Sequence, residues 1–194
     1  MSQATVGDPT LEALVPRGSW WRSAVLVVLG VVLLVASWVV LPRVMPTVTT
    51  NGGMAAEFAP ESREVAVVDL APHAWGGVTV RSIDDVPGAH VLDAWAYPGT
   101  VTFDHPMPEG VSSADFLATL VRDSDRLPRT LPSGQPATLV VLWQIDSCQM
   151  ASRGNSHISV HLAGRFGLTR VEDLSFGGPM LSPGSWADGT PCLP

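Results

Sequence analysis

The chain has 194 residues and a formal net charge of −7, with 46% hydrophobic and 15% charged residues. This composition is too apolar for a disordered protein, and the length suits one ordinary domain with an additional segment. All 11 basic residues are arginines without a cluster, so we expect no nucleic-acid partner, and the negative charge disfavours attraction to anionic lipid or wall polymers.

A single apolar run, residues 23–41, dominates the N-terminal part of the chain. As a helix it would be about 28 Å long, which matches the hydrocarbon core of a bilayer. Trp20 and Trp21 precede the run and Trp38 lies near its other end, where aromatic rings favour the headgroup level. We therefore predict a single-pass transmembrane helix over residues 23–41, which anchors the protein in the lipid bilayer and follows a flexible tail, residues 1–22.

A cleaved signal peptide is the alternative interpretation of the apolar run. The hydrophobic region of a signal peptide spans about 7–15 residues and is followed closely by a small-x-small cleavage site. Here the run is longer, and the nearest such site, GMAAE at residues 53–57, lies well beyond it. The run is therefore expected to remain as a signal anchor.

Charges and cysteines together predict the orientation. Arg17 and Arg22 stand on one side of the run against Arg43 on the other, which favours a cytoplasmic N-terminus. Cys148 and Cys192 both fall in the C-terminal part, as expected for a disulfide in an oxidising compartment. We expect the C-terminal domain to be extracytoplasmic, at the cell membrane, with these cysteines paired; a catalytic Cys148 thiol is the disfavoured alternative.

Beyond the run, the sequence changes character twice. Residues 42–63 mix Pro, Gly, Thr and Asn, which is typical of a linker, and we predict an extracytoplasmic stalk. Residues 64–194 then show short alternating apolar runs between turn residues, the pattern of half-buried strands in a β-rich ectodomain. The expected strands are 64–70, 77–83, 90–96, 99–105, 137–146, 156–162 and 165–174, of which 137–146 is apolar on both faces and should be central.

One segment, residues 112–127, breaks the strand pattern. Ser112 can cap a helix, Asp115 follows three residues later, and an apolar stripe recurs at helical spacing through Phe116 and Leu120. About seven strands, one helix and no alternation of strands with helices predict a mostly β protein, an antiparallel β-sandwich of immunoglobulin-like type with one helical insertion. An α+β layer, with the helix packed on an antiparallel sheet, is the alternative.

The order of these segments resembles a known class of proteins. APHAWGGVTV, later TLPSGQPATLVVLWQIDSC, a strand pair and a terminal cysteine together look like the membrane-anchored immunoglobulin-like ectodomains of uncharacterised actinobacterial single-pass proteins. The resemblance covers about two thirds of the chain, and the helical segment departs from a plain sandwich. It implies a fold and a surface location, and it implies no activity.

Motifs for catalysis or metal binding are weak. The sequence has no G-x-S-x-G elbow, no S-x-x-K motif and no cysteine with a convincing histidine partner. His157 and His161 would lie about 13 Å apart on a predicted strand, too far to share one ion, although Asp146 on a facing strand could approach one of them. We therefore predict no cofactor and no enzyme activity, and we keep these three residues as weak metal candidates.

Tryptophans in the predicted ectodomain are candidates for binding or packing. Trp75 and Trp186 lie in predicted loops, where large rigid aromatic side chains can carry interface energy, so both are possible partner contacts. Trp143 lies in the most apolar strand and is expected in the core against the disulfide, as in immunoglobulin-like domains.

In the apolar run, small residues recur every seven positions. Ser23, Gly30 and Ser37 would align along one face of a helix and could let another helix approach closely. We favour a non-catalytic extracytoplasmic binding or accessory domain with an unknown protein or envelope partner. A signalling or assembly subunit that acts through its membrane helix is the alternative, and an envelope metalloenzyme is less favoured.

Overall fold

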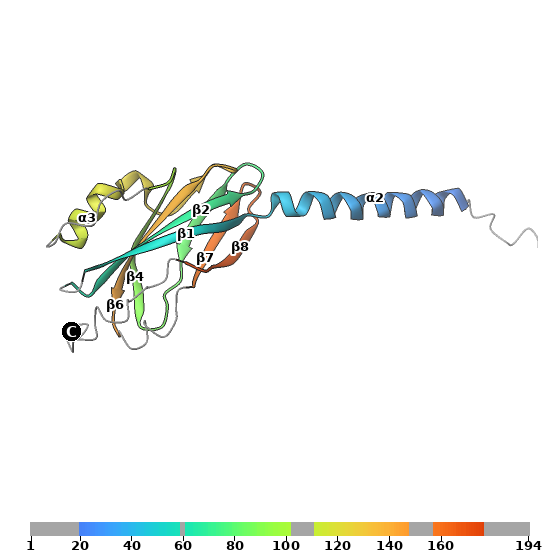
Figure 1. The fold of residues 1–194 in the computed structure, drawn as a ribbon. Coiled ribbons are helices and arrows are strands. Elements are labelled where there is room, and N and C mark those ends of the chain that lie inside the picture. The colour runs from blue at the N-terminus through green and yellow to red at the C-terminus, as the bar shows by residue number, and fades with distance from the viewer. Residues whose placement is uncertain (1–19, 59–60, 102–110, 148–156, 177–194) are drawn as a thin grey trace, which may run out of the picture. The chain divides into compact units, whose positions relative to one another are not determined.

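The computed structural model describes residues 20–58, 61–101, 111–147 and 157–176. The chain divides into two compact units at residues 41 and 42, and each is described by itself. The described part of the first unit is helical, whereas every described strand belongs to the second unit (Figure 1).

Helix α2 (Trp20–Val44) contains the apolar run and extends three residues beyond it at either end. It is long and apolar enough to cross a membrane, and none of its residues is buried within the chain. An isolated apolar helix with no buried face gains nothing from the protein interior, so its side chains are compatible with a lipid surrounding.

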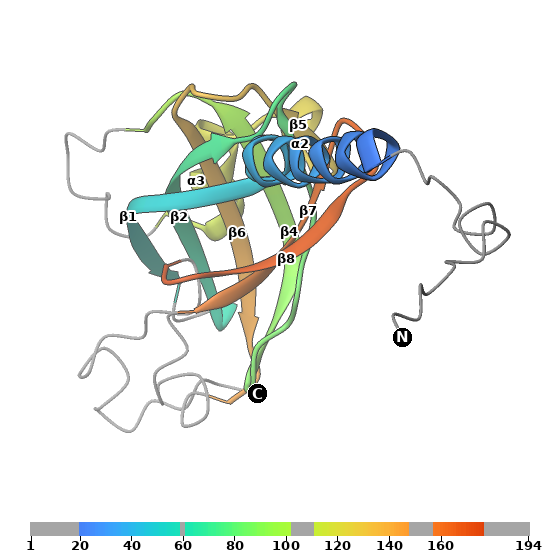
Figure 2. The same cartoon turned by 90° about the vertical axis from the view of Figure 1, so that its right-hand side faces the viewer.

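The second unit is a sandwich of two antiparallel four-stranded sheets, as predicted (Figures 1 and 2). The first sheet has the order β1-β2-β6-β4, with bounds Thr47–Phe58, Arg63–His73, Ala137–Ile145 and Ala89–Pro98. The second sheet has the order β5-β3-β7-β8, with bounds Arg129–Leu131, Val78–Ile83, Ile158–Gly164 and Thr169–Leu174.

The main core lies between the two sheets and follows the alternation of the strands. Ile158, Val160 and Leu162 of β7 are buried as predicted, because every second side chain of a strand points to the same face. Trp143 of β6 is fully buried in the same cluster, which confirms its expected place in the core.

A second apolar cluster lies on the outer face of the first sheet, where helix α3 (Ser113–Leu120) covers it. The helix buries Phe116 and Leu117 against Val65 of β2 and Val140 of β6, so β6 is covered on both faces, as predicted. The Ser112 side chain accepts a hydrogen bond from the Asp115 backbone amide, which confirms the predicted cap. The helix is shorter than expected and gives way to a 3₁₀ turn, η2 (Asp123–Asp125).

Two predicted segments differ from the structure. Residues 42–63, expected as a stalk, contain the whole of β1, which pairs along its length with β2 and buries Val48 and Phe58. The strand expected over residues 99–105 does not begin at residue 99: β4 runs through Tyr97 to Pro98, residues 99–101 lie outside any strand, and residues 102–105 lie outside the described residues. The Gly99 amide donates to the Pro136 carbonyl. The short strand β5 was not predicted.

Candidate functional site

The loop that joins β2 to β3 presents the most exposed aromatic side chain of the sandwich's described residues. Trp75 is 67% exposed, yet its backbone is fixed, because its amide donates a 2.7 Å hydrogen bond to the carbonyl of Arg43. The neighbouring Ala74 amide donates to the Ser133 hydroxyl oxygen at 3.2 Å. A tryptophan whose backbone is held while its ring remains in solvent is well suited to contact a partner.

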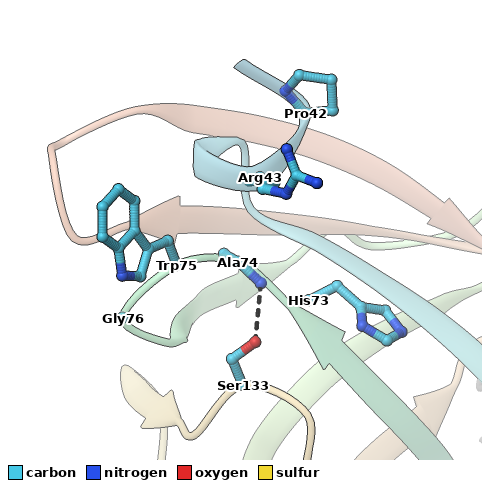
Figure 3. A pocket seen from close by; sticks show the side chains of 7 residues that line it. All are labelled: Pro42, Arg43, His73, Ala74, Trp75, Gly76 and Ser133. Carbon is cyan, nitrogen blue, oxygen red and sulfur yellow. Dashed lines mark hydrogen bonds between the residues drawn. The ribbon is translucent and has the colours of Figure 1, made fainter. Parts of the chain in front are cut away.

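Around this loop lies an open hollow of ≈ 590 Å³ (Figure 3). We call it the helix-end hollow; it is lined by Pro42, Arg43, His73, Ala74, Trp75, Gly76 and Ser133. The lining brings together the last turn of α2, the end of β2 and the β5–β6 loop. It offers a guanidinium, an imidazole and an indole ring and contains no carboxylate, so its chemistry suits an anionic or zwitterionic group beside an apolar surface.

A second exposed aromatic side chain belongs to the turn between β7 and β8. Phe166 in this turn is 63% exposed, and the adjacent Arg165 makes no ion pair or hydrogen bond with any described residue. The turn lies against the Trp75 loop, because a Cβ atom on Gly76 would be 2.7 Å from Cδ of Arg165. Its base lies beside the start of β1, since a Cβ atom on Gly164 would be 3.2 Å from the Val44 carbonyl oxygen.

Charge is unevenly distributed over the sandwich. Four segments meet around the hollow, and we call them the helix-end loops: residues 42–46, 71–77, 131–136 and 164–168. They contain two arginines and no Asp or Glu, although the whole chain carries a charge of −7. Four carboxylates lie at the other ends of the same strands, Glu61, Asp84, Asp85 and Asp146, whereas Glu172 of β8 lies near the start of β1 and accepts a hydrogen bond from the Val48 amide.

The weak metal candidates are not brought together. Asp146, after β6, lies 2.9 Å from Nδ1 of His90, whereas His161 of β7 lies 2.8 Å from Oδ1 of Asp84 through its Nε2. The predicted approach of Asp146 to a β7 histidine was therefore wrong, and His157 is exposed just before the strand begins. Within residues 20–58, 61–101, 111–147 and 157–176, no three metal-ligating side chains form a cluster.

Other predicted site residues have different outcomes. Cys148, Cys192 and Trp186 lie outside the described residues, so their pairing and contact remain predictions. The residues predicted for the membrane are all exposed on α2: Trp20, Trp21, Trp38, Ser23, Gly30 and Ser37. The Ser37 hydroxyl donates to the Leu34 carbonyl at 2.8 Å, so its polar group is satisfied within the helix.

Two titratable groups with shifted pKa values lie outside the hollow. The Glu61 carboxylate accepts hydrogen bonds from the hydroxyl and amide of Ser113 at the start of α3, and these bonds, with the nearby Arg63 guanidinium, lower the pKa of Glu61. Burial raises the pKa of Tyr97 on the outer face of the first sheet. The first group therefore holds the helix in place, and neither faces the exposed indole.

Sequence reasoning found Trp75 and missed the rest of the hollow. Arg43 and Ser133 come from distant segments, and only the fold brings them to the loop. Phe166 falls within residues 165–174, which were expected to form a strand, whereas β8 begins at Thr169 and Phe166 lies in the turn before it. The neighbouring Gly167 was a signal for a turn at this point. Comparisons of the chain with protein-family models, curated proteins and solved structures found no match.

Proposed function

We propose that this chain is a single-pass protein of the cell membrane with a cytoplasmic N-terminus and an extracytoplasmic, non-catalytic binding or accessory domain. The observation that carries the proposal is Trp75, an exposed ring on a fixed backbone, joined by a hydrogen bond to the end of an apolar helix. A domain of this kind acts by contact, and the helix-end hollow is its contact site.

Anchoring is supported by the composition of α2. Residues 23–41 contain no charge, and tryptophans lie near both ends of the run, which suits a bilayer core between two headgroup layers. Arg17 and Arg22 before the run outnumber Arg43 after it, which favours a cytoplasmic N-terminus. The Cys148 and Cys192 pair, expected as a disulfide, supports the same orientation.

Binding rather than catalysis is supported by the chemistry of the hollow. Its one hydroxyl nucleophile, Ser133, accepts a hydrogen bond from the Ala74 amide and has no histidine or carboxylate partner among the described residues. The histidine–carboxylate pairs of the sandwich, such as His161 with Asp84, lie on exposed surface away from it. A charged and aromatic surface without an activated nucleophile is typical of recognition.

Site-specific photo-cross-linking tests the contact site. Trp75→benzoylphenylalanine is placed in the full chain in its native membrane, with Val171→benzoylphenylalanine as the control, because Val171 is also exposed but lies on β8. We expect a cross-linked adduct at position 75 and a much weaker one at position 171. Equal labelling at both positions would contradict a contact site at the hollow.

Orientation and the role of the helix need a separate experiment. A protease added outside intact cells should digest the sandwich and spare residues 1–22. Exchange of residues 23–41 for an unrelated apolar helix should leave the cross-link at position 75 unchanged. Loss of that cross-link after the exchange would favour the alternative, an assembly or signalling subunit that acts through Ser23, Gly30 and Ser37.

A further inference from the structure

We infer that the partner of the helix-end hollow is the phospholipid headgroup layer of the same bilayer that α2 crosses. Trp75 and Phe166 would enter the interface, and Arg43 and Arg165 would contact lipid phosphates. The inference rests on the proposed anchoring and deepens it, because it names what the exposed loops bind.

The first argument is distance along the chain. Arg43 follows Leu41, the last residue of the apolar run, by two positions, which is about 3 Å of helix rise. The headgroup layer of one leaflet is roughly 5–7 Å thick, from the difference between the full bilayer and its hydrocarbon core. The Trp75 amide is hydrogen-bonded to the Arg43 carbonyl at 2.7 Å, so the backbone of the loop contacts a residue that follows the apolar run by only two positions.

The second argument is the pair of aromatic side chains. Trp75 and Phe166 come from two different turns: the Trp75 amide is bonded to the Arg43 carbonyl, and a Cβ atom on Gly164 at the base of the other turn would lie 3.2 Å from the Val44 carbonyl oxygen. A tryptophan ring with its N–H group is favoured at the boundary between headgroups and acyl chains, and a phenylalanine on the adjacent turn adds apolar area. Two adjacent turns that both expose an aromatic ring are explained by a shared apolar surrounding.

The third argument is the local charge. The net charge of −7 predicts repulsion from anionic lipid. However, salt screens the interaction between charges beyond about 8–10 Å at physiological ionic strength, so the charged groups closest to the lipid determine whether the interaction is attractive. The helix-end loops contain Arg43 and Arg165 and no carboxylate, whereas Glu61, Asp84 and Asp146 lie at the other ends of the strands. The Glu172 carboxylate near the start of β1 accepts a hydrogen bond from the Val48 amide and is paired with Arg170. Guanidinium groups bind phosphate well, and their stems can lie along apolar surface.

Fluorine NMR of the full chain in lipid nanodiscs tests this inference. The protein is labelled with 5-fluorotryptophan in phosphatidylcholine–phosphatidylglycerol nanodiscs that contain a lipid with a gadolinium headgroup, and Trp→Phe variants assign the signals. We expect the Trp38 and Trp75 signals to broaden and that of the core residue Trp143 to stay sharp. A sharp Trp75 signal beside a broadened Trp38 signal would overturn the lipid contact, would favour a protein partner and would leave the anchor intact. A sharp Trp38 signal would instead contradict the anchoring itself.

A charge variant tests the arginine contribution. Arg165→Glu is compared with Arg81→Glu, an equal charge change at an exposed arginine of β3. In the same nanodisc experiment, we compare the population in which Trp75 contacts lipid with the population in which it does not. We expect Arg165→Glu to lower the ratio of the first to the second roughly fivefold and Arg81→Glu to change it little, since a basic residue attracts lipid only when it lies near the membrane surface. Equal effects of the two variants would overturn the phosphate contact of Arg165.

Discussion

The backbone amide of Val48 donates a 2.8 Å hydrogen bond to the carboxylate of Glu172, which joins the edge strand β1 of one sheet to β8 of the other. Val48 is 2% exposed, so its amide has no access to water as a substitute partner. The bond closes one side of the sandwich, in a segment that the sequence pattern assigns to a linker.

We expect Glu172→Ala to destabilise the sandwich by about 1–3 kcal/mol, because it leaves the buried Val48 amide without an acceptor. Glu172→Gln should cost less, since its side-chain carbonyl can still accept. Urea unfolding of the full chain in detergent micelles, followed by tryptophan fluorescence, measures both. Thr169→Ala, an exposed change on the same strand, is the control, and an equal loss in Glu172→Ala and Thr169→Ala would contradict the role of the bond.

Glu61 should make the stability depend on acid pH. Its pKa is lowered in the folded protein chiefly by the Ser113 hydroxyl, so the carboxylate stabilises the fold above its ordinary value of 4.5. This contribution is lost as the pH falls through the lowered pKa of the folded state. We expect Glu61→Gln to cost about 1 kcal/mol at pH 7, similar to the loss of a helix cap.

Urea unfolding of the full chain at a series of pH values between 7 and 3 tests this expectation. The stability difference between the wild type and Glu61→Gln should shrink as the pH falls. Asp123→Asn, at an exposed position of η2, is the control and should show no such convergence. A difference that stays constant over the whole range would contradict the assignment to Glu61.

Two glycine variants test how the Trp75 loop is held. Gly77 has φ +97°, and a Cβ atom there would lie 2.7 Å from the Leu131 carbonyl oxygen, whereas Gly134 has φ +73° in open space. Gly134→Ala should cost roughly 1–2 kcal/mol from backbone strain alone. Gly77→Ala should lower the free energy of unfolding by about 1–3 kcal/mol more than Gly134→Ala does, because the new Cβ atom would also force the backbone at Leu131 to move. Equal thermal stabilities of the two variants would contradict this expectation and would show that the loop accommodates the Cβ atom at residue 77 without loss of stability.

The predicted pairing of Cys148 with Cys192 is directly measurable. They are the only cysteines of the chain, so intact mass with and without alkylation of the unreduced protein counts free thiols without ambiguity. We expect no free thiol in the native protein. We also expect Cys192→Ser to lower the free energy of unfolding by about 4 kcal/mol, since the disulfide would close a loop of roughly 45 residues. Alkylation of Cys148 in the native protein would contradict both the disulfide and the support that it gives to the orientation.

The sequence predicted most of the strands and could not predict their partners. Strands rich in alternating β-branched residues, such as β3 and β7, were visible, whereas β1 contains Gly52, Gly53 and a bulge and is only partly buried, as an edge strand needs. The pairings of His90 with Asp146 and of His161 with Asp84 follow from the sheet order and from bulges near Arg81 and Leu92. A bulge changes the register of strand pairing but is not recognisable from the amino-acid composition of the strand.

The candidate site divides in the same way. Trp75 was predicted because an apolar ring in a glycine-rich loop is a local signal. The contribution of Arg43 was not predictable, because it depends on where β1 begins after the helix. Once a linker is expected there, the helix end and the β2–β3 loop have no reason to meet.

The position of β1 also has a mechanical consequence. Only Met45 and Pro46 separate Val44, the end of α2, from Thr47, the first residue of β1. A force transmitted through α2 therefore enters the sandwich at Thr47, because the two intervening residues allow little extension. When the pull runs along the strand, it acts in shear on the whole β1–β2 ladder, from Thr47 with His73 to Phe58 with Arg63, so the bonds share the force. Strand β1, which lies in the segment expected to be a stalk, is thus placed to resist tension.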